Sequence, residues 1–368
     1  MSNQYIWQDK EWPNMHWDSN ALCLLLSEVN SLRGCLYGRL TALGIDMQGL
    51  SLLASLTQEI ADSSEIEGEQ LNRDSVRSSV SRQLGLEYNG LPHPNHYVEG
   101  VVQVMLDATQ NFRMPLTPER LFGWHAALFP TGYSGPYKIA VAQWRQDDEP
   151  MQVVSGPLGR QRVHFQAPPS SQVAPMMGKL IDWVNDETLP IDSLVKAAVA
   201  HLWFVTIHPF DDGNGRIART LTEYMLSKAD GSPLRFYNHS SVLLLHRNDY
   251  YRRLEHAQHG GLDITQWVEW FLLSLKESLT QALGKTDNVL RKTAFWDRHR
   301  ETPINERQRK VINMLFDGFS GKLNTSKWYK INHCSQDTAL RDIHDLIDKG
   351  ILRTSTEGGR STNYELCE

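Results

Sequence analysis

The chain has 368 residues, of which 40% are hydrophobic and 22% are charged. This composition is ordinary for a globular protein and excludes disorder as the main state, while the length predicts two or three domains. Lys and Arg number 37 against 43 Asp and Glu, a formal net charge of −6 that argues against a general polyanion-binding protein.

The cysteines and the N-terminal residues indicate the compartment. The four cysteines, Cys23, Cys35, Cys334 and Cys367, are scattered and form no C-x-x-C pair, which argues against a disulfide scaffold and suits a reducing environment. Residues 1–12 hold neither the apolar region nor the cleavage site of a signal peptide, and the longest apolar run, residues 21–26, is too short to span a membrane. We therefore expect a cytoplasmic protein with no membrane partner.

Apolar residues that recur at intervals of three and four predict a mainly α-helical chain. Tryptophans at positions 7, 12 and 17 fit neither a helix nor a strand period, so we expect an irregular segment there that pins a small N-terminal unit. After the candidate N-caps Asp18 and Ser19, a helix is expected over residues 22–40. Further helical patterns cover residues 51–67, 97–112, a helix opened by Thr117-Pro118, 173–185, 194–206, 214–229, 250–257 and 264–283.

Two stretches depart from this pattern. Residues 130–170 are rich in Gly and Pro, and the β-prone pieces 153–154 and 163–165 on either side of a turn predict a hairpin. Residues 284–302 are polar and mixed in charge, which is typical of a linker or a connecting helix. The tail, residues 303–366, has an apolar pattern of its own.

The segment 207–219 carries most of the residues that could do chemistry, and it lies between two helical patterns. The proline after His208 disfavours helix at that residue, so the first helix should end there and free the imidazole. Gly213 and Gly215 allow the backbone to turn its N–H groups inward. The helix that starts near residue 214 adds a dipole that favours phosphate.

Three charged side chains complete this cradle. Arg216 and Arg219, three residues apart, share one helix face and can reach the same phosphate chain. Asp212 is a hard oxygen ligand suited to Mg²⁺ on those phosphates. The segment therefore predicts a polyphosphate site with a base beside it, and an unperturbed histidine titrates near neutral pH.

The pattern Gly213-x-Gly215-x-x-Ala218 also matches the loose dinucleotide-binding fingerprint. That fingerprint needs a strand before it and an acidic residue at the end of a second strand. Residues 195–205 instead keep helical spacing, and no strand pattern precedes Asp230. We therefore prefer the polyphosphate interpretation, in which Phe210 anchors the turn in the core.

The segment resembles the signature of the Fic (filamentation induced by cAMP) family, H-P-F-x-[D/E]-G-N-G-R-x-x-R. All nine fixed positions are present over residues 208–219, and the resemblance extends over roughly residues 50–285. It implies an all-α core in which the motif joins two helices. It also implies transfer of AMP from ATP to a hydroxyl side chain of a target protein.

The same resemblance implies a role for each motif residue. His208 would be the general base, and Asp212 would hold Mg²⁺ between the phosphates. The anion hole around the α-phosphate would be formed by Gly213, Asn214 and Gly215. The rest of the triphosphate would be bound by Arg216 and Arg219. Family members that act as kinases depart from the glycine at position 213, so its presence favours adenylylation over phosphorylation.

Two further sets of residues resemble parts of the family's substrate site. The hairpin is similar to the flap that clamps a target segment by strand addition, and its residues would be Val153, Val154, Ser155 and Gly156. Tyr250 resembles a tyrosine that contacts adenine. Gln258, eight residues on, stands where relatives often have Asn.

Residues 63–68 resemble the family's inhibitory motif, [S/T]-x-x-x-E-[G/N], with Ser63 at its first position and Glu67 at its acidic one. Glu67 would reach Arg219 and occupy the space of the γ-phosphate, because an Arg–carboxylate pair is bidentate and strong when partly desolvated. The resemblance thus implies self-inhibition by a helix that covers about residues 51–68.

The tail resembles a winged helix, with three helices and a wing at Gly358-Gly359-Arg360. Such domains often bind DNA. Residues 303–366, however, hold ten Lys and Arg against eight Asp and Glu, and three aspartates lie on the expected recognition helix, at positions 337, 342 and 345. We therefore favour protein docking or homodimer contact over DNA binding.

Four other histidines raise the question of a metal site: His93, His96, His256 and His259. No cysteine or carboxylate grouping completes a set of ligands around them. We interpret them as surface or loop residues.

The sequence predicts a mainly α protein of four parts: a Trp-rich helical domain over residues 1–95, a Fic catalytic domain over 96–284, a linker over 285–302 and a winged helix over 303–368. The expected activity is that of a self-inhibited protein adenylyltransferase that uses ATP and Mg²⁺ on a Tyr, Ser or Thr of a target protein. Two alternatives stay open: a phosphodiesterase that removes AMP from a modified protein, and a nucleotide-sensing transcriptional regulator.

Overall fold

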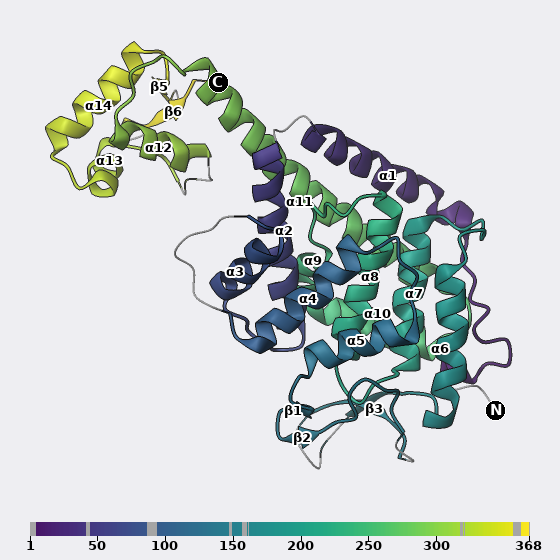
Figure 1. Ribbon diagram of the computed structural model, residues 1–368. Coiled ribbons are helices and arrows are strands. Elements are labelled where there is room, and N and C mark those ends of the chain that lie inside the picture. Colours follow the sequence, from purple (N-terminus) through teal and green to yellow (C-terminus); the bar gives the residue numbers. More distant parts are fainter. Residues whose placement is uncertain are drawn as a thin grey trace. The chain divides into compact units, whose positions relative to one another are not determined.

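The computed structural model describes residues 5–41, 45–86, 94–146, 149–156, 160, 162–316, 319, 321–355 and 362–367 (Figure 1). The chain divides into two compact units, which are residues 1–282 and residues 283–368. The described part is mainly helical, and its strands form three separate antiparallel pairs. The predicted fold class is confirmed.

The first unit contains most of the elements. Its N-terminal part comprises the 3-10 helix η1 (Ile6–Gln8), α1 (Ser19–Thr41), α2 (Ile45–Ile66), α3 (Arg73–Gln83), α4 (His96–Gln110) and α5 (Pro118–Leu128). Two hairpins follow, β1 (Tyr133–Ser134) with β2 (Tyr137–Lys138) and β3 (Gln152–Ser155) with β4 (Arg162–Gln166). The remaining helices are α6 (Ser170–Asn185), α7 (Ser193–Ile207), α8 (Asn214–Asp230), α9 (His239–Leu245), α10 (Arg247–His259) and α11 (Thr265–Arg298), whose last turns belong to the second unit.

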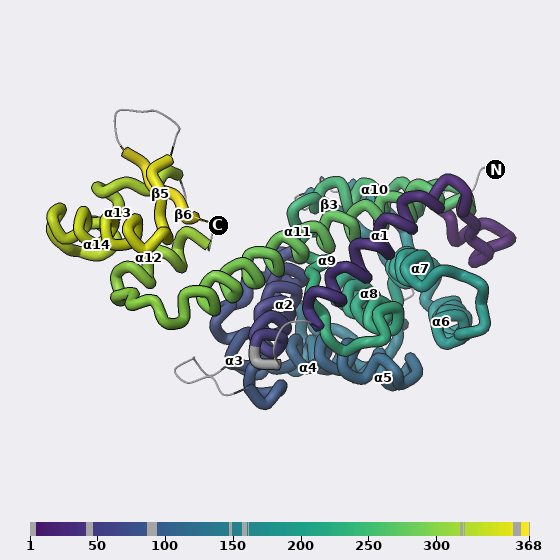
Figure 2. The backbone as a smooth tube through the Cα atoms, turned by 90° about the horizontal axis from the view of Figure 1, so that it is seen from above, coloured from purple at the N-terminus to yellow at the C-terminus, as the bar shows by residue number. Residues whose placement is uncertain are grey.

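The core of the first unit is built around α7. Every residue of this helix from Leu194 to Ile207 is buried, and a helix that is apolar all round belongs inside a protein. α8 lies beside α7 in both views of the backbone and packs along it (Figures 1 and 2). α6 covers another side of α7, while α2 packs against α9 and α8. The six residues 208–213 join the two central helices.

The N-terminal segment packs on the β3–β4 hairpin, and its predicted role in pinning a small N-terminal unit stays a prediction. The indole N–H of Trp7 donates to the carbonyl of Gln166 on β4 at 2.8 Å. Tyr5 packs edge-to-face on Phe165 of the same strand, with ring centroids 5.2 Å apart. The contacts in this segment therefore hold one strand of the β3–β4 hairpin. A domain boundary at residue 95 stays a prediction.

Helix boundaries differ from the predicted ones in a few places. Thr117 caps α5 through its hydroxyl and Pro118 opens the helix, as predicted. α2 begins six residues before the predicted start at residue 51. α3 and α9 have no counterpart among the predicted helices. Residues 285–298, placed in a linker, continue α11, so this stretch takes the form of a connecting helix.

The second unit has its own hydrophobic core. It comprises the end of α11, then α12 (Glu306–Phe316), α13 (Thr325–Asn332), α14 (Gln336–Asp348), β5 (Leu352–Thr354) and β6 (Tyr364–Leu366). Trp328, Ile343 and Ile351 are among its fully buried residues. The residues predicted as a wing, 358–360, lie outside the described residues, and the winged-helix assignment stays a prediction. None of the helices described in the chain has the length and apolar character needed to cross a membrane.

One close helix contact in the first unit gives a stability test. Gly100 on α4 faces α5 so closely that a β-carbon there would lie 2.1 Å from the carbonyl oxygen of Ala127. We expect Gly100→Ala to lower the free energy of unfolding by about 1–3 kcal/mol, because the helices must separate. Thermal and urea unfolding followed by circular dichroism would measure the loss.

Gly178 on α6 is the matched control, because a β-carbon there meets no atom within 4 Å. Gly178→Ala should leave stability unchanged or raise it by about 0.5–1 kcal/mol through the better helix propensity of alanine. Equal stability of the two variants would contradict the close packing of α4 on α5.

Candidate functional site

The site is the turn of residues 208–213 between α7 and α8. His208 ends α7 in the left-handed conformation, with φ 52° and ψ 59°, in agreement with the expected stop before proline. A left-handed conformation is uncommon for a residue other than glycine and persists only where its surroundings impose it. Neighbouring side chains hold this turn in place.

Arg145 fixes the start of the turn. Its side chain is buried, and Nε donates to the carbonyl of His208 at 2.8 Å while Nη2 donates to that of Pro168. Its backbone N–H donates to the carbonyl of Pro209 at 2.9 Å. A cation at a helix C-terminus satisfies carbonyl groups that the helix leaves without partners. Sequence analysis missed Arg145, which lies more than sixty residues away in an irregular segment.

Asn214 closes the turn on itself. Its side-chain Oδ1 accepts from the backbone N–H of Phe210 at 2.9 Å, and its Nδ2 donates to the carbonyl of the same residue at 2.7 Å. The side chain of Asn214 thus shapes the turn, and its predicted place in the anion hole stays a prediction. The backbone N–H of Asn214 is what it presents at the start of α8.

Phe210 and His125 anchor the middle of the turn. Phe210 is fully buried, as expected, and its ring stacks on the His125 imidazole with centroids 4.2 Å apart and an interplanar angle of 7°. Nδ1 of His125 accepts from the backbone N–H of Ala142, so Nε2 carries the proton and donates to the carbonyl of Asp212 at 3.2 Å. Burial lowers the pKa of His125 to about 4, so the ring is neutral at pH 7. Sequence analysis missed this histidine on α5.

The turn holds two partly exposed carboxylates, and Asp212 is the one predicted to bind a cation. Its Oδ1 accepts from the backbone N–H of Gly213 at 2.6 Å, and its Oδ2 accepts from the hydroxyl of Ser134. A carboxylate has about four acceptor sites, so two remain for another donor or a cation. The neighbouring Asp211 is used differently, since its Oδ2 accepts from the backbone N–H of Ala140 at 2.8 Å.

The two glycines leave room at the N-terminus of α8. Gly213 has φ 79°, and a β-carbon on it would lie 2.7 Å from the ring of Phe129. A β-carbon on Gly215 would lie 2.1 Å from Oε1 of Glu67. No side chain among the described residues caps this helix end, so its N–H groups and dipole face the same space. This is the backbone geometry that the sequence predicts for an anion site.

The motif arginines are buried on one face of α8, and each meets a carboxylate. Arg216 donates through Nη1 to Glu69 at 2.9 Å and to the hydroxyl of Tyr97 at 2.6 Å. Arg219 donates to the hydroxyl of Ser63 at 2.9 Å and to its carbonyl at 2.8 Å. Both guanidinium groups therefore lie against the end of α2 and the residues after it.

Glu67 lies one residue beyond the end of α2, beside the turn. Its Oε1 is 2.8 Å from Nη1 of Arg219, so the contact expected from the sequence is present. Its Oε2 accepts from the hydroxyl of Tyr251 at 3.3 Å. Gly68, with φ 87°, turns the chain after it, so that Glu67 and Glu69 reach the two motif arginines.

The imidazole of His208 is neutral at physiological pH. Burial lowers its pKa to about 4, below the value near neutrality expected from the sequence. Nδ1 lies 3.3 Å from the carbonyl of Val205, a contact that places the proton on Nδ1 and leaves the lone pair on Nε2. The ring remains partly exposed and can accept a proton through Nε2.

The two predicted adenine-contacting residues lie in the core. Tyr250 is 1% exposed, and its hydroxyl is 2.8 Å from Nε2 of His201. Gln258 is buried and its amide lies 3.4 Å from the hydroxyl of Thr206. An adenine ring reaches either side chain only if its neighbours move. The next residue in the same Tyr-Tyr pair, Tyr251, is the one that contacts Glu67 at the site.

The predicted flap is a hairpin, as expected. Val154 on β3 pairs with Val163 on β4, and both side chains are exposed, at 40% and 43%. Val153 pairs with Phe165 and packs toward Tyr5. The flap end Gly156 has φ 98°. Ser155 bonds His164 across the pair at 2.6 Å.

The additional histidines form no metal site in the part of the chain that the structure describes. No group of three or more His, Cys, Asp and Glu there could hold an ion. His96 is almost fully exposed, and Nε2 of His259 bonds the carbonyl of His164. His93 lies outside the described residues.

The low pKa of His208 predicts a pH dependence of stability. Below pH 6.5 the unfolded chain protonates this imidazole while the native protein does so only near pH 4, so native stability falls as the pH drops through this range. We expect His208→Asn, which tolerates the left-handed conformation, to lose less stability on acidification than the wild type, by about 1 kcal/mol per pH unit. Urea unfolding at pH 8, 7, 6 and 5 measures the difference, which should be constant above pH 7. A constant difference down to pH 5 would contradict the lowered pKa of this ring.

Comparison with known proteins identifies two segments. Residues 115–226 match the model of the Fic/DOC family, and residues 5–86 match a domain of unknown function, DUF4172. Protein adenylyltransferase fic-1 of Caenorhabditis elegans is 34% identical over 117 residues, which are 30% of this chain and 21% of that protein. A probable protein adenylyltransferase of Aquifex aeolicus is 29% identical over 102 residues, 28% of this chain and 29% of that protein.

The matched region thus spans between a fifth and a third of these curated relatives. Among solved structures, a Fic family protein from Desulfovibrio desulfuricans has a similar fold over 97% of this chain and 98% of its own, with a TM-score of 0.56 and 19% identity. The motif turn lies inside the matched region, with its histidine, glycines and arginines in place. The chain therefore contains a Fic domain over residues 115–226, preceded by a DUF4172 segment.

Proposed function

We propose that the Fic domain transfers AMP from ATP to the hydroxyl group of a Tyr, Ser or Thr in a target protein, and that Glu67 inhibits this transfer. The observation that carries the proposal is the position of a neutral imidazole beside an uncapped helix N-terminus with two buried arginines. The names of the curated relatives, protein adenylyltransferases, support the same reaction.

The triphosphate would bind along the first turns of α8. The backbone N–H groups after Gly213 suit the oxygens of one phosphate, because the helix dipole favours negative charge there. Arg216 and Arg219 would bind the following phosphates bidentately once they are free of their carboxylates. A β-carbon on Gly215 would enter this space, and one on Gly213 would meet the ring of Phe129, so the site needs glycine at both positions.

The transfer needs a base for the target hydroxyl. In the proposed step, Nε2 of His208 takes the hydroxyl proton while the hydroxyl oxygen attacks the α-phosphorus. The bond between the α-phosphorus and the bridging oxygen breaks, and pyrophosphate leaves with the electron pair. Phosphoryl-type transfers depend mostly on positioning and charge stabilisation, so a rigid turn with an anion cradle suits this reaction.

The carboxylate of Asp212 is suited to binding magnesium. Mg²⁺ is usually bound through one or two carboxylates together with substrate phosphates, and Asp212 retains two acceptor sites for it. Asp212 would therefore hold Mg²⁺, which when bound neutralises charge on the phosphates. Ser134 and the N–H of Gly213 orient this carboxylate.

Glu67 would inhibit by occupying the place of a phosphate. Its carboxylate lies against Arg219 and fills the space above Gly215, so an anion cannot bind that guanidinium until Glu67 leaves. Glu69 holds Arg216 in the same way. The residues after α2 thus place two carboxylates where the proposed ligand carries its own negative charges.

The β3–β4 hairpin offers a place for the target. The outer edge of β4 already bonds the side chains of Trp7 and His259, so the outer edge of β3 is the one to which an extended segment can add through backbone hydrogen bonds. Val154 and Val163 form an exposed apolar pair on one face of it. We propose that a target segment pairs with this hairpin and presents its hydroxyl to His208.

The first prediction tests the inhibitory contact. Glu67→Gly should raise incorporation of labelled AMP from ATP by about tenfold to a hundredfold, because it frees a buried guanidinium from its carboxylate ion-pair partner. Glu65→Gly is the matched control, since this glutamate lies two residues away and faces Arg73 at 4.0 Å instead. Mass spectrometry of lysate proteins after incubation with each variant would identify the modified residue.

His208→Ala in the Glu67→Gly background should abolish incorporation. Activity that survives this change would overturn the catalytic assignment. Equal activity of Glu67→Gly and Glu65→Gly would overturn the inhibitory one. ATP binding without any labelled product would favour a nucleotide sensor, and AMP release from a modified protein would favour the reverse phosphodiesterase.

A second prediction concerns Glu69. Glu69→Gln should lower the KM for ATP by a smaller factor, about threefold, because this side chain is 41% exposed and Tyr97 remains on Arg216. Its effect should be largest in the Glu67→Gly background, where Arg219 is already free. Steady-state kinetics with varied ATP measures it. An unchanged KM in both backgrounds would show that Glu69 does not compete with the nucleotide.

A further inference from the structure

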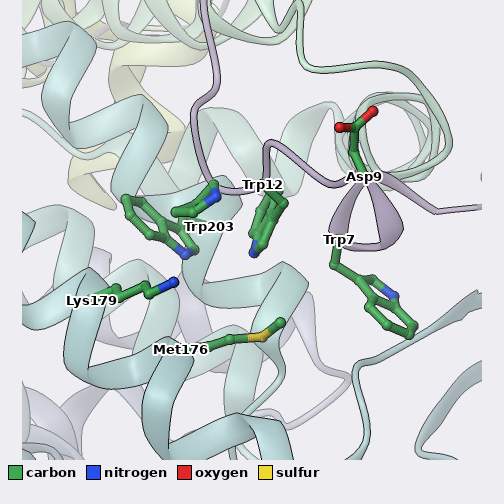
Figure 3. Close-up of a pocket in the computed structure, with 7 residues that line it drawn as sticks. Trp7, Asp9, Trp12, Met176, Lys179 and Trp203 are labelled. Atoms are coloured by element: carbon green, nitrogen blue, oxygen red, sulfur yellow. The ribbon is translucent and has the colours of Figure 1, made fainter.

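A cavity lies away from the motif turn, between the N-terminal segment and helices α6 and α7 (Figure 3). Its volume is about 210 Å³. The residues that line it are Trp7, Asp9, Trp12 and Pro13 from the N-terminal segment, Met176 and Lys179 from α6, and Trp203 from α7. The cavity is therefore formed jointly by the DUF4172 segment and the Fic domain.

Two buried indole N–H groups in its wall have no hydrogen-bond partner. They belong to Trp12 and Trp203, and the side chain of Trp203 is 4% exposed. A buried donor without a partner is costly, and an indole can only donate. Figure 3 shows both indole nitrogens and the ammonium group of Lys179 turned toward the same space. The cavity thus presents three donors together.

The acidic residue at the rim does not balance these donors. Figure 3 shows the carboxylate of Asp9 turned away from the cavity, and its Oδ1 accepts from the backbone N–H of Glu11 at 2.9 Å. A ligand that meets the three donors therefore has to supply acceptor atoms. Because one donor is an ammonium ion, a negatively charged acceptor fits best.

The other walls are apolar and fixed. Trp7 uses its indole N–H on the carbonyl of Gln166, so it offers only its ring to the cavity. Trp12 meets Trp203 edge-to-face, with centroids 6.1 Å apart, and Met176 lies opposite them (Figure 3). Aromatic rings and a thioether are suited to a flat or short apolar group.

We propose that this cavity binds a small organic carboxylate. The carboxylate oxygens would accept from the indole N–H groups of Trp12 and Trp203 and from Lys179, and the apolar body would lie between Trp7 and Met176. A cavity of about 150 Å³ holds a benzene molecule, so the volume here suits a single aromatic ring with one carboxylate. The site is distinct from the phosphate cradle, which it does not need for binding.

Benzoate is the probe, and the full chain is the protein to use. Isothermal calorimetry should show one saturable site with a dissociation constant below about 10 mM, and tryptophan fluorescence should change in parallel. Trp203→Phe keeps an aromatic ring, although a smaller one, and removes the N–H, while Lys179→Met keeps a long unbranched side chain and removes the charge. Each should weaken benzoate binding about tenfold or more.

The controls separate this site from general effects. Trp296→Phe in the second unit, whose indole N–H already bonds Asn313, should leave benzoate binding unchanged. Benzamide, which is neutral and brings extra donors, should bind at least tenfold more weakly than benzoate. ATP at saturating concentration should not displace benzoate.

Four results would overturn the proposal, three of them from the binding measurements alone. These three are no saturable binding of benzoate, equal binding of benzamide, and binding that survives in Lys179→Met and Trp203→Phe alike. Lys179 is exposed, so its variant is expected to fold, and it keeps the test valid if Trp203→Phe is unstable. Displacement of benzoate by ATP would place the probe in the cradle and would also overturn it.

Discussion

A helix buried on every side must give its last carbonyl groups to other donors when it ends inside the protein. α7 is such a helix, and Arg145 meets this need by donating to the carbonyls of Ile207 and His208. Asn214 then closes the turn that follows by bonding both backbone groups of Phe210. Because these bonds fix the reversal of the chain, the imidazole of His208 and the N-terminus of α8 are held side by side. The geometry of the candidate site is a consequence of how this backbone problem is solved.

The sequence was sufficient for the elements with a strong apolar period or a clear breaker. α7 and α8 show both, with proline after His208 and glycine before Asn214, so the two helices and the turn between them could be predicted. α3 could not, because only Val76 and Val80 form its apolar line among serines and arginines. The end of α11 is mostly polar and therefore resembles a linker, yet it is helical and places Phe295 in the core of the second unit.

The candidate site was predictable where its residues are neighbours in sequence. The residues that hold the turn from elsewhere, His125 and Arg145, come from α5 and an irregular segment, and no local pattern says which distant side chain satisfies a buried carbonyl. The pKa near neutrality that the sequence predicts for His208 was wrong for a related reason. Its shift arises from burial, which depends on how the other helices pack and not on the residues beside it.

The buried arginines connect the stability of the resting protein with its proposed regulation. A guanidinium that is 1% or 5% exposed, as in Arg219 and Arg216, needs a negative partner, because an uncompensated buried charge costs several kcal/mol. Burial also strengthens their attraction for phosphate, so a site that binds a triphosphate, as proposed, would need a substitute anion when it is empty. Glu67 and Glu69 provide that substitute from the chain itself. On this view binding of ATP would replace the two carboxylates by phosphates at little electrostatic cost. Inhibition would then be a competition between glutamate and phosphate for the arginines, and any event that moves the end of α2 would change its outcome.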